Sequence, residues 1–259
     1  MTAELQSTTQ GQTMVLTLSN PEHRNALGPE MYAAGVEALS VAESSADVRS
    51  VVITGAGSIF SAGGNLQRLL DNRKQPPEVQ ARSIEGLHSW IESIRTFPKP
   101  VIAAVEGAAA GAGFSLALAC DFIVAADDAV FVMAYSNVAL SPDGGASWSL
   151  AQALPRQLVN ELLMCGERIA PARLQVLGLV NQVTAPGSAL PAALALAEKL
   201  NGRAPNVLAS IKELVGDAAT ATLNTQLAVE RDHFVRNLHH PNAGAGIEAF
   251  LARQPARYK

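Results

Sequence analysis

The stretch that decides the fold is Lys99–Asp121, which reads KPVIAAVEGAAAGAGFSLALACD. It opens with a short apolar run typical of a buried strand, passes through alanine and glycine, and ends in the pattern of a small-residue helix that begins near Gly111. The first N–H groups of a helix have no partner inside the helix and lie at the positive end of its dipole. The stretch therefore predicts a strand followed by a helix start that suits an oxygen acquiring negative charge.

A second glycine-rich turn precedes it at Ile53–Leu66, which reads ITGAGSIFSAGGNL. A buried-type strand is followed here by a loop whose small residues, Ala62, Gly63 and Gly64, leave backbone N–H groups accessible. Taken singly, each turn is better explained by close packing of backbone on backbone.

Short apolar runs alternate with helical patterns over most of the chain, which is typical of an α/β fold with a largely buried sheet. Amphipathic helices are expected over 28–44 and 78–97. From about Leu190 the pattern is purely helical, which predicts a core over 1–195 and a helical C-terminal region over 196–259. Strands are expected where the apolar runs begin, at Met14, Arg49, Pro100, Phe122 and Leu179.

Composition and charge exclude several classes of function. The 259 residues are 48% hydrophobic and 16% charged, which predicts a soluble globular protein with a sizeable core. Nineteen basic and 23 acidic residues give a net charge of −4 without a basic stripe, so no nucleic-acid or membrane partner is expected. No apolar stretch has the length of a membrane span and no secretory signal is recognisable, which favours a cytoplasmic protein.

The common motifs give no support to other chemistries. Cys120 and Cys165 lie in apolar surroundings without metal-ligand spacing and are expected to be buried free thiols. The five histidines show no pairing typical of a metal site, so no metal is expected. The sequence contains no phosphate-binding P-loop, no dinucleotide-binding glycine motif and no serine elbow of the α/β-hydrolases.

The order of the segments resembles the enoyl-CoA hydratase/isomerase family, also called the crotonase family. The resemblance implies a crotonase-like α/β spiral of ββα units, a C-terminal region that trimerises and can pair into hexamers, and an acyl-CoA substrate. It implies no cofactor, because coenzyme A enters as part of the substrate. It covers essentially the whole chain and rests on NPEHRNAL (Asn20–Leu27), FSAGGNL (60–66), the stretch 99–121, LSPDGGASWSLAQALPRQLVNELLMCGERI (140–169) and AFLARQPARY (249–258).

The family's hallmark is an oxyanion hole, a pair of backbone N–H groups that polarise the thioester carbonyl, and the resemblance places these groups on Ala62 and Ala112. The same resemblance implies several substrate-binding positions. These are Arg24, Ala26 and Leu27 in a CoA-binding wall, Gly63, Asn65 and Leu66 in the loop after the first turn, and Phe250 and Arg253, which would meet CoA on a neighbouring subunit.

The departures from the family pattern indicate the chemistry. Hydratases of the family carry two glutamates, one to activate water and one to manage the proton, and these positions align with Ser115 and Tyr135. The acid that faces the site by alignment is Asp143, in SPDGG, as in the family's isomerases and dihydroxynaphthoyl-CoA synthases. Taken alone, SPDGG is typical of a tight turn with no catalytic role. The alignment with the family instead favours Asp143 as the sole general base. Ser115 and Tyr135 either orient the substrate or line the pocket.

Two further positions carry expectations about structure. Asn65 stands where the family usually has an aspartate, and it is expected to affect hydrogen bonding in its loop more than catalysis. Asp121 is expected to be structural.

The sequence therefore favours isomerisation of a double bond or ring through a thioester enolate, like that of the epoxyphenylacetyl-CoA isomerases. Hydration of an enoyl-CoA, or hydrolytic opening of a ring such as oxepin-CoA, in fatty-acid or phenylacetate catabolism, is the second hypothesis. A non-catalytic or RNA-binding member is less favoured, because the net charge is −4 and aromatic residues make up 5% of the chain. Dehalogenases and decarboxylases on the same fold stay open.

Overall fold

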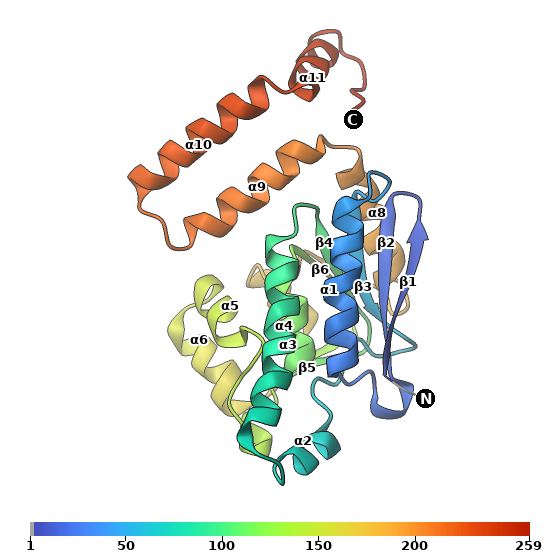
Figure 1. Cartoon of the computed structure of the whole chain (residues 1–259), viewed down its shortest axis with the longest axis vertical. Coiled ribbons are helices and arrows are strands. Elements are labelled where there is room, and N and C mark those ends of the chain that lie inside the picture. Colours follow the sequence, from blue (N-terminus) through green and yellow to red (C-terminus); the bar gives the residue numbers. More distant parts are fainter. Residues whose placement is uncertain (1–2) are drawn as a thin grey trace.

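The computed structural model describes residues 3–259 and is built on a twisted main sheet (Figure 1). Within these residues the sheet has the strand order β1-β2-β3-β4-β6-β9. β1 runs antiparallel to β2, and every other neighbouring pair is parallel. The strands are β1 (Glu4–Gln10), β2 (Thr13–Ser19), β3 (Ser50–Gly55), β4 (Val101–Val105), β6 (Phe122–Ala126) and β9 (Gln182–Thr184).

A second, smaller sheet has the order β5-β7-β8. Its strands are β5 (Ala108–Ala110), β7 (Val130–Val132) and β8 (Arg168–Ile169). The strands expected from Met14, Arg49, Pro100 and Phe122 are confirmed as β2, β3, β4 and β6, whereas the run from Leu179 becomes a strand only at β9.

The expected amphipathic helices over 28–44 and 78–97 are confirmed as α1 and α3, and the small-residue helix begins at Ala112 with Gly111 as its N-cap. No helix among residues 3–259 has the length and apolar character needed to cross a membrane. The α-helices are α1 (Pro29–Ser44), α2 (Leu66–Asn72), α3 (Pro77–Thr96), α4 (Ala112–Ala119), α5 (Ala146–Ala153), α6 (Arg156–Asn160), α7 (Pro171–Val176), α8 (Ala189–Asn201), α9 (Pro205–Ala218), α10 (Leu223–Leu238) and α11 (Pro241–Leu251).

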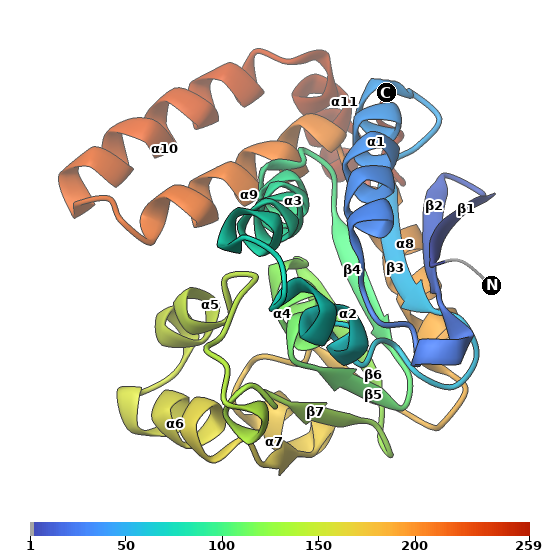
Figure 2. The same cartoon turned by 60° about the horizontal axis from the view of Figure 1, so that its bottom comes forward.

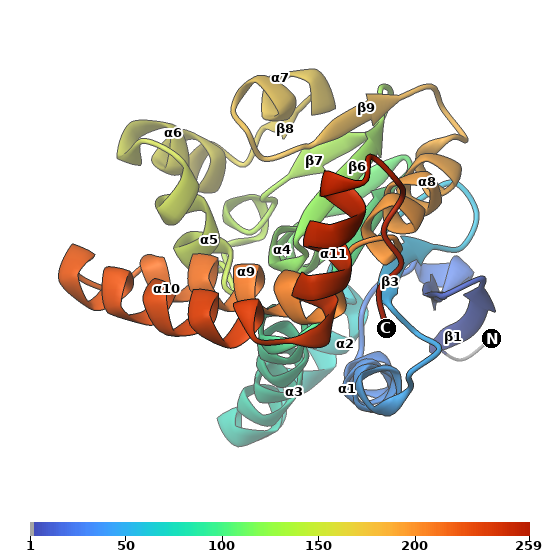
Figure 3. The ribbon, with the colours of Figure 1, turned by 90° about the horizontal axis from the view of Figure 1, so that it is seen from above.

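Helices cover both faces of the main sheet, so its parallel strands are apolar on both sides. Val52 of β3 and Ile102 of β4 pack with Ala193 of α8 on one face. Their neighbours in sequence, Ile53 and Ala103, point to the opposite face and pack in the larger core that α1 and α3 cover. Figure 3 shows the sheet between these two helix layers.

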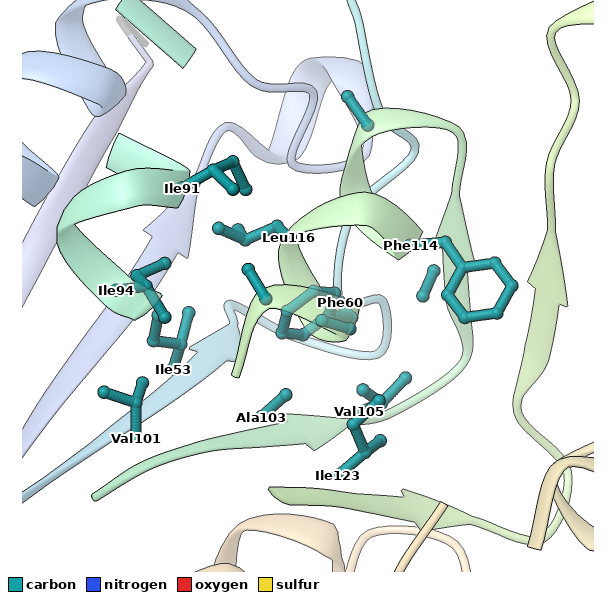
Figure 4. Close-up of a cluster of buried hydrophobic side chains, with 14 of the residues drawn as sticks. Ile53, Phe60, Ile91, Ile94, Val101, Ala103, Val105, Phe114, Leu116 and Ile123 are labelled. Carbon is teal, nitrogen blue, oxygen red and sulfur yellow. The ribbon is translucent and has the colours of Figure 1, made fainter. Parts of the chain in front are cut away.

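The larger core also holds α4 against the sheet. Figure 4 shows Phe60, Ile94 of α3 and Phe114 of α4 gathered over the strand residues Ile53 and Ile123. Phe60, Ile94 and Phe114 are fully buried. Because densely packed interiors deform little, this cluster fixes the position of the start of α4.

The C-terminal region begins later than the sequence indicates. The expected boundary between residues 195 and 196 falls inside α8, whose Ala197 is fully buried in the cluster on the sheet. The core therefore extends to Asn201, and the separate helical region begins with α9. The helices α9, α10 and α11 extend away from the sheet (Figure 1).

A partly buried ion pair ties α9 to the core. Lys212 Nζ of α9 lies 2.8 Å from Asp121 Oδ2 and donates to the carbonyl oxygen of Ile94, and the same Asp121 oxygen accepts from Val101 N–H. Burial raises the pKa of Asp121 and lowers that of Lys212, while the attraction between the two charges opposes both shifts. Asp121 is therefore structural, as expected. Its neighbour Cys120 is partly buried, whereas Cys165 is exposed, so the expectation of a buried thiol was wrong there.

We expect Asp121→Ala to lower the free energy of unfolding by up to about 3–5 kcal/mol, because Lys212, whose side chain is only 14% exposed, loses its counter-ion. Chemical denaturation measures the change. The matched control is Asp71→Ala, which removes the partner of Lys74 from a pair whose side chains are 59% and 75% exposed. An exposed pair contributes up to about 1 kcal/mol, so equal losses in the two variants would contradict the structural role of Asp121.

Candidate active site

One cavity of about 380 Å³ brings together the glycine-rich loops and Asp143. Figure 2 shows the helices α2, α3 and α4, which lie close together around this part of the fold. The walls of the cavity come from α1, from the loop before α2, from α2 and α3, from the start of α4, and from the segment before α5. The residues that line it are Tyr32, Ala62, Gly64, Leu66, Arg68, Leu69, Gln80, Ser83, Ile84, Leu87, His88, Gly111, Ala112, Ala134, Tyr135, Val138, Leu140, Ser141, Pro142 and Asp143.

Glycine allows the two loops to approach each other closely. Gly63 has a φ of +86°, and a Cβ atom there would lie 2.5 Å from the carbonyl oxygen of Ala110. A side chain at this position would force the loops apart. Gly63 therefore holds its loop against the start of α4 and brings backbone N–H groups of both segments to one cavity.

The first expected oxyanion donor requires a correction. Ala62 lines the cavity, but its N–H donates to the carbonyl oxygen of Arg24 at 3.0 Å and is not free for a substrate. The Gly63 N–H is also used, because it donates to Ser61 Oγ. Among residues 3–259, the N–H groups of Gly64 and Ala112 have no acceptor, and both residues line the cavity. These two groups are the available donors.

Asp143 lies in a turn that packs directly on α4. Gly144 and Gly145 have φ values of +59° and +75°, and a Cβ atom on Gly144 would lie 2.9 Å from the Cβ atom of Ser115. The glycines thus allow the turn to adopt a left-handed backbone and to sit close to the helix. Asp143 is half-buried and lines the cavity, and within residues 3–259 it is the one carboxylate that does so.

Ser115 and Tyr135, which the resemblance aligns with the two glutamates of hydratases, contact Asp143 directly. Tyr135 Oη donates to Asp143 Oδ1 at 2.6 Å, and Ser115 Oγ lies 3.0 Å from the Asp143 carbonyl oxygen and 3.2 Å from Tyr135 Oη. Burial, and next the negative charge of Asp143, raise the pKa of Tyr135 far above its usual range. Tyr135 therefore stays protonated and acts as a hydrogen-bond donor to the carboxylate.

The segment expected to form a CoA-binding wall holds the loops in place. Arg24 adopts a left-handed backbone conformation with an exposed side chain, and its carbonyl oxygen takes the Ala62 N–H. Ala26 is buried, and the buried Leu27 donates its N–H to the Gly63 carbonyl oxygen at 2.7 Å. None of these three residues lines the cavity, so their part in binding CoA stays a prediction.

Asn65 and Leu66 have different surroundings. Asn65 Oδ1 accepts from the Arg68 N–H at 3.0 Å and caps the N-terminus of α2, which agrees with the expectation that it affects the loop. Leu66 is 55% exposed and lines the cavity. Phe250 is 82% exposed on α11, and neither it nor Arg253 lines the cavity of its own chain. Their expected contact with CoA on a neighbouring subunit stays a prediction.

Comparison with known proteins identifies the family of this chain. The sequence profile described as enoyl-CoA hydratase/isomerase matches residues 8–259. The chain belongs to the enoyl-CoA hydratase/isomerase family. It is therefore an acyl-CoA enzyme of that family, and a cavity that combines free backbone amides with a carboxylate is in keeping with such chemistry.

Relatives in this family carry different activities. The chain is 35% identical to the 1,2-epoxyphenylacetyl-CoA isomerase of Escherichia coli over 95% of its length and 94% of the relative's. It is 30% identical to the 2,3-dehydroadipyl-CoA hydratase of the same organism over 99% of both chains. A crystal structure of an enoyl-CoA hydratase from Polaromonas sp. JS666 is 68% identical, with a TM-score of 0.98 over 99% of this chain and 100% of that one. The crotonase-like fold expected from the sequence is thus confirmed.

The sequence did not indicate most of the residues that line the cavity, and three of these matter for its chemistry. Gly64 was noted only as a small residue of the loop, and Arg68 and Tyr32 were not noted at all. The signal for Arg68 was present, since an asparagine three residues before it is typical of a helix N-terminus and would have predicted α2. Tyr32 lies within the expected helix 28–44, but the helical pattern does not show which of its residues reach a cavity.

Proposed function

We propose that this enzyme isomerises unsaturated acyl-CoA thioesters by moving a proton through an enolate. The observation that carries the proposal is that, among residues 3–259, a single carboxylate, Asp143, lines the cavity that also exposes the free N–H groups of Gly64 and Ala112. Moving a proton from one carbon to another needs one base that later acts as an acid. Adding water needs a second group to manage the water.

In the proposed reaction, the Gly64 and Ala112 N–H groups donate to the carbonyl oxygen of the thioester. Asp143 takes the α-proton of a β,γ-unsaturated acyl group, so the Cα–H bond breaks and its electron pair moves onto that oxygen. The dienolate then collapses, the α,β double bond forms, and the γ-carbon takes the proton back from Asp143. Two hydrogen bonds to the oxygen stabilise the enolate more than the ground state, which lowers the barrier.

A panel of β,γ-unsaturated acyl-CoAs tests the proposal. An isomerase yields the conjugated thioester with no change of mass in ordinary water, and ultraviolet absorbance and mass spectrometry detect the product. A product heavier by one water identifies a hydratase instead, the activity for which the crystal structure from Polaromonas is named. Hydration of an α,β-unsaturated thioester without any movement of the double bond would overturn the proposal.

We also propose that Tyr135 positions the base. Its hydrogen bond occupies Asp143 Oδ1 and leaves Asp143 Oδ2, for which residues 3–259 supply no hydrogen-bond donor, to face the substrate. Tyr135→Phe keeps the ring and removes this bond, so we expect kcat to fall by about 10-fold with KM nearly unchanged, in line with a bond to a charged group. Steady-state kinetics measure both constants. The Ser115→Ala variant serves as the comparison. If Tyr135→Phe instead raised KM and left kcat unchanged, Tyr135 would line the substrate pocket and would not position the base.

Assembly is proposed from the C-terminal helices. Several large apolar side chains of α9, α10 and α11 are at least two-thirds exposed in the single chain, among them Val215, Leu223, Phe234 and Phe250. Exposed apolar surface of this kind marks an interface between proteins. We expect light scattering to give three or six copies of the 27.0 kDa chain. A monomer at every concentration would remove the proposed contact of Phe250 and Arg253 with CoA on a neighbouring subunit.

A further inference from the structure

Arg68 lies in the wall of the cavity and carries a positive charge. The proposed reaction gives this charge no role. The residue lies on α2, whose start is fixed by the cap from Asn65 to the Arg68 N–H, and its side chain is half-buried. The guanidinium lies next to Gly28, and a Cβ atom on Gly28 would be 2.8 Å from Arg68 Nη1. The glycine at position 28 therefore leaves room for the guanidinium.

Arg68 forms no ion pair within the described part of the chain, although Glu30 lies nearby, with its Oε2 atom 3.2 Å from the place of a Cβ atom on Gly28. The Nε atom of Arg68 is buried without an acceptor among residues 3–259. A guanidinium has five N–H donors in a fixed, planar arrangement, and a buried donor without an acceptor is costly. Arg68 therefore has hydrogen-bonding capacity that the described residues leave unused, and because the residue lines the cavity, its guanidinium can meet an anion there.

A second polar side chain, that of Tyr32 on α1, lies near Arg68. Tyr32 is 5% exposed and lines the same cavity, and burial raises the pKa of its hydroxyl, while the neighbouring charge of Arg68 offsets part of the rise. Tyr32 therefore stays protonated and can donate beside the guanidinium. A planar guanidinium and a hydroxyl suit a carboxylate, whose two oxygens can each accept hydrogen bonds.

We propose that the cavity accepts acyl-CoA thioesters whose acyl group carries a second carboxylate, bound by Arg68 together with Tyr32. This inference rests on the proposed function only in that the acyl group enters the cavity containing Asp143. A CoA phosphate would offer similar anionic chemistry to Arg68, and the experiment separates the two sources.

Binding of saturated thioesters tests the inference without any turnover. Calorimetry compares succinyl-, adipyl- and suberyl-CoA with butyryl-, hexanoyl- and octanoyl-CoA, which match them in length and have no second carboxylate. We expect the full-length enzyme to bind at least one diacid thioester about 10- to 100-fold more tightly than its neutral partner. We expect Arg68→Met to abolish this difference and the control Arg73→Met, at an exposed position outside the cavity, to keep it.

Each other result has a distinct meaning. If Arg68→Met weakened diacid and neutral thioesters equally, Arg68 would bind a CoA phosphate and the inference would be overturned. It would also be overturned if the wild-type enzyme showed no preference for any diacid. Failure of the proposed isomerisation, in contrast, appears only in the turnover assay, where the double bond would not move although the diacid thioester still binds through Arg68.

Discussion

Replacing Asp143 by asparagine is expected to reduce turnover of a β,γ-unsaturated acyl-CoA by about 10²–10⁴-fold or more. Asparagine has nearly the same shape and can still accept the hydrogen bond that Tyr135 Oη donates at 2.6 Å, so the turn and its contacts with α4 should persist. Its amide cannot take up the α-proton at neutral pH. The loss would therefore report the missing base and not a change of structure.

The isotopic measurement is sharper than the rate. In deuterated water the wild-type enzyme should exchange or transfer the α-proton of a bound thioester, and the Asp143→Asn variant should do neither, although its affinity for a saturated acyl-CoA stays close to normal. Asp128→Asn, at an exposed position outside the cavity, is the control and should behave as the wild type. Near-normal exchange in Asp143→Asn would place the base elsewhere and remove the main support for isomerisation.

The sequence could predict the parts of the fold whose pattern is periodic. The sheet strands bury both of their faces and the amphipathic helices bury one side, and this burial is visible in the residue types. These elements are β2, β3, β4 and β6 and the helices α1 and α3. β1, with the sequence ELQSTTQ, was missed because it is a largely exposed edge strand held by its pairing with β2. The end of the core was misplaced because α8 resembles the helices that follow it, and only its contact with the sheet distinguishes it.

In the site, the sequence indicated the side chains that meet but not the backbone N–H group that is free. The resemblance implied that Asp143, Ser115 and Tyr135 belong to one site, and the structure brings them into hydrogen-bond contact. Which N–H of a glycine-rich loop stays free depends on a carbonyl group far away in sequence, since Arg24 takes the Ala62 N–H and leaves that of Gly64. The sequence alone could not predict that choice, because no side chain marks it.

The second large effect is expected from Ala112→Pro. Ala112 is the first residue of α4, a position where proline fits the backbone and where its N–H has no partner among residues 3–259. The substitution therefore removes one donor to the thioester oxygen without breaking a hydrogen bond of the fold. Losing one such donor typically reduces turnover by about 10²–10³-fold. Ala112→Gly removes only the side chain and keeps the N–H, so it should retain most of the activity.

The comparison of the two variants separates the backbone donor from packing. Ala112 is 3% exposed, so losing or changing its side chain could disturb the start of α4 in both variants, and thermal unfolding would detect this. A folded Ala112→Pro enzyme that lost turnover while Ala112→Gly kept it would assign the effect to the N–H group. The proline should also lower the affinity for enolate-like inhibitors more than for substrate, because the donor matters most when the oxygen is charged. Full activity in the folded proline variant would exclude Ala112 as an oxyanion donor and leave Gly64 as the one amide of the proposed pair.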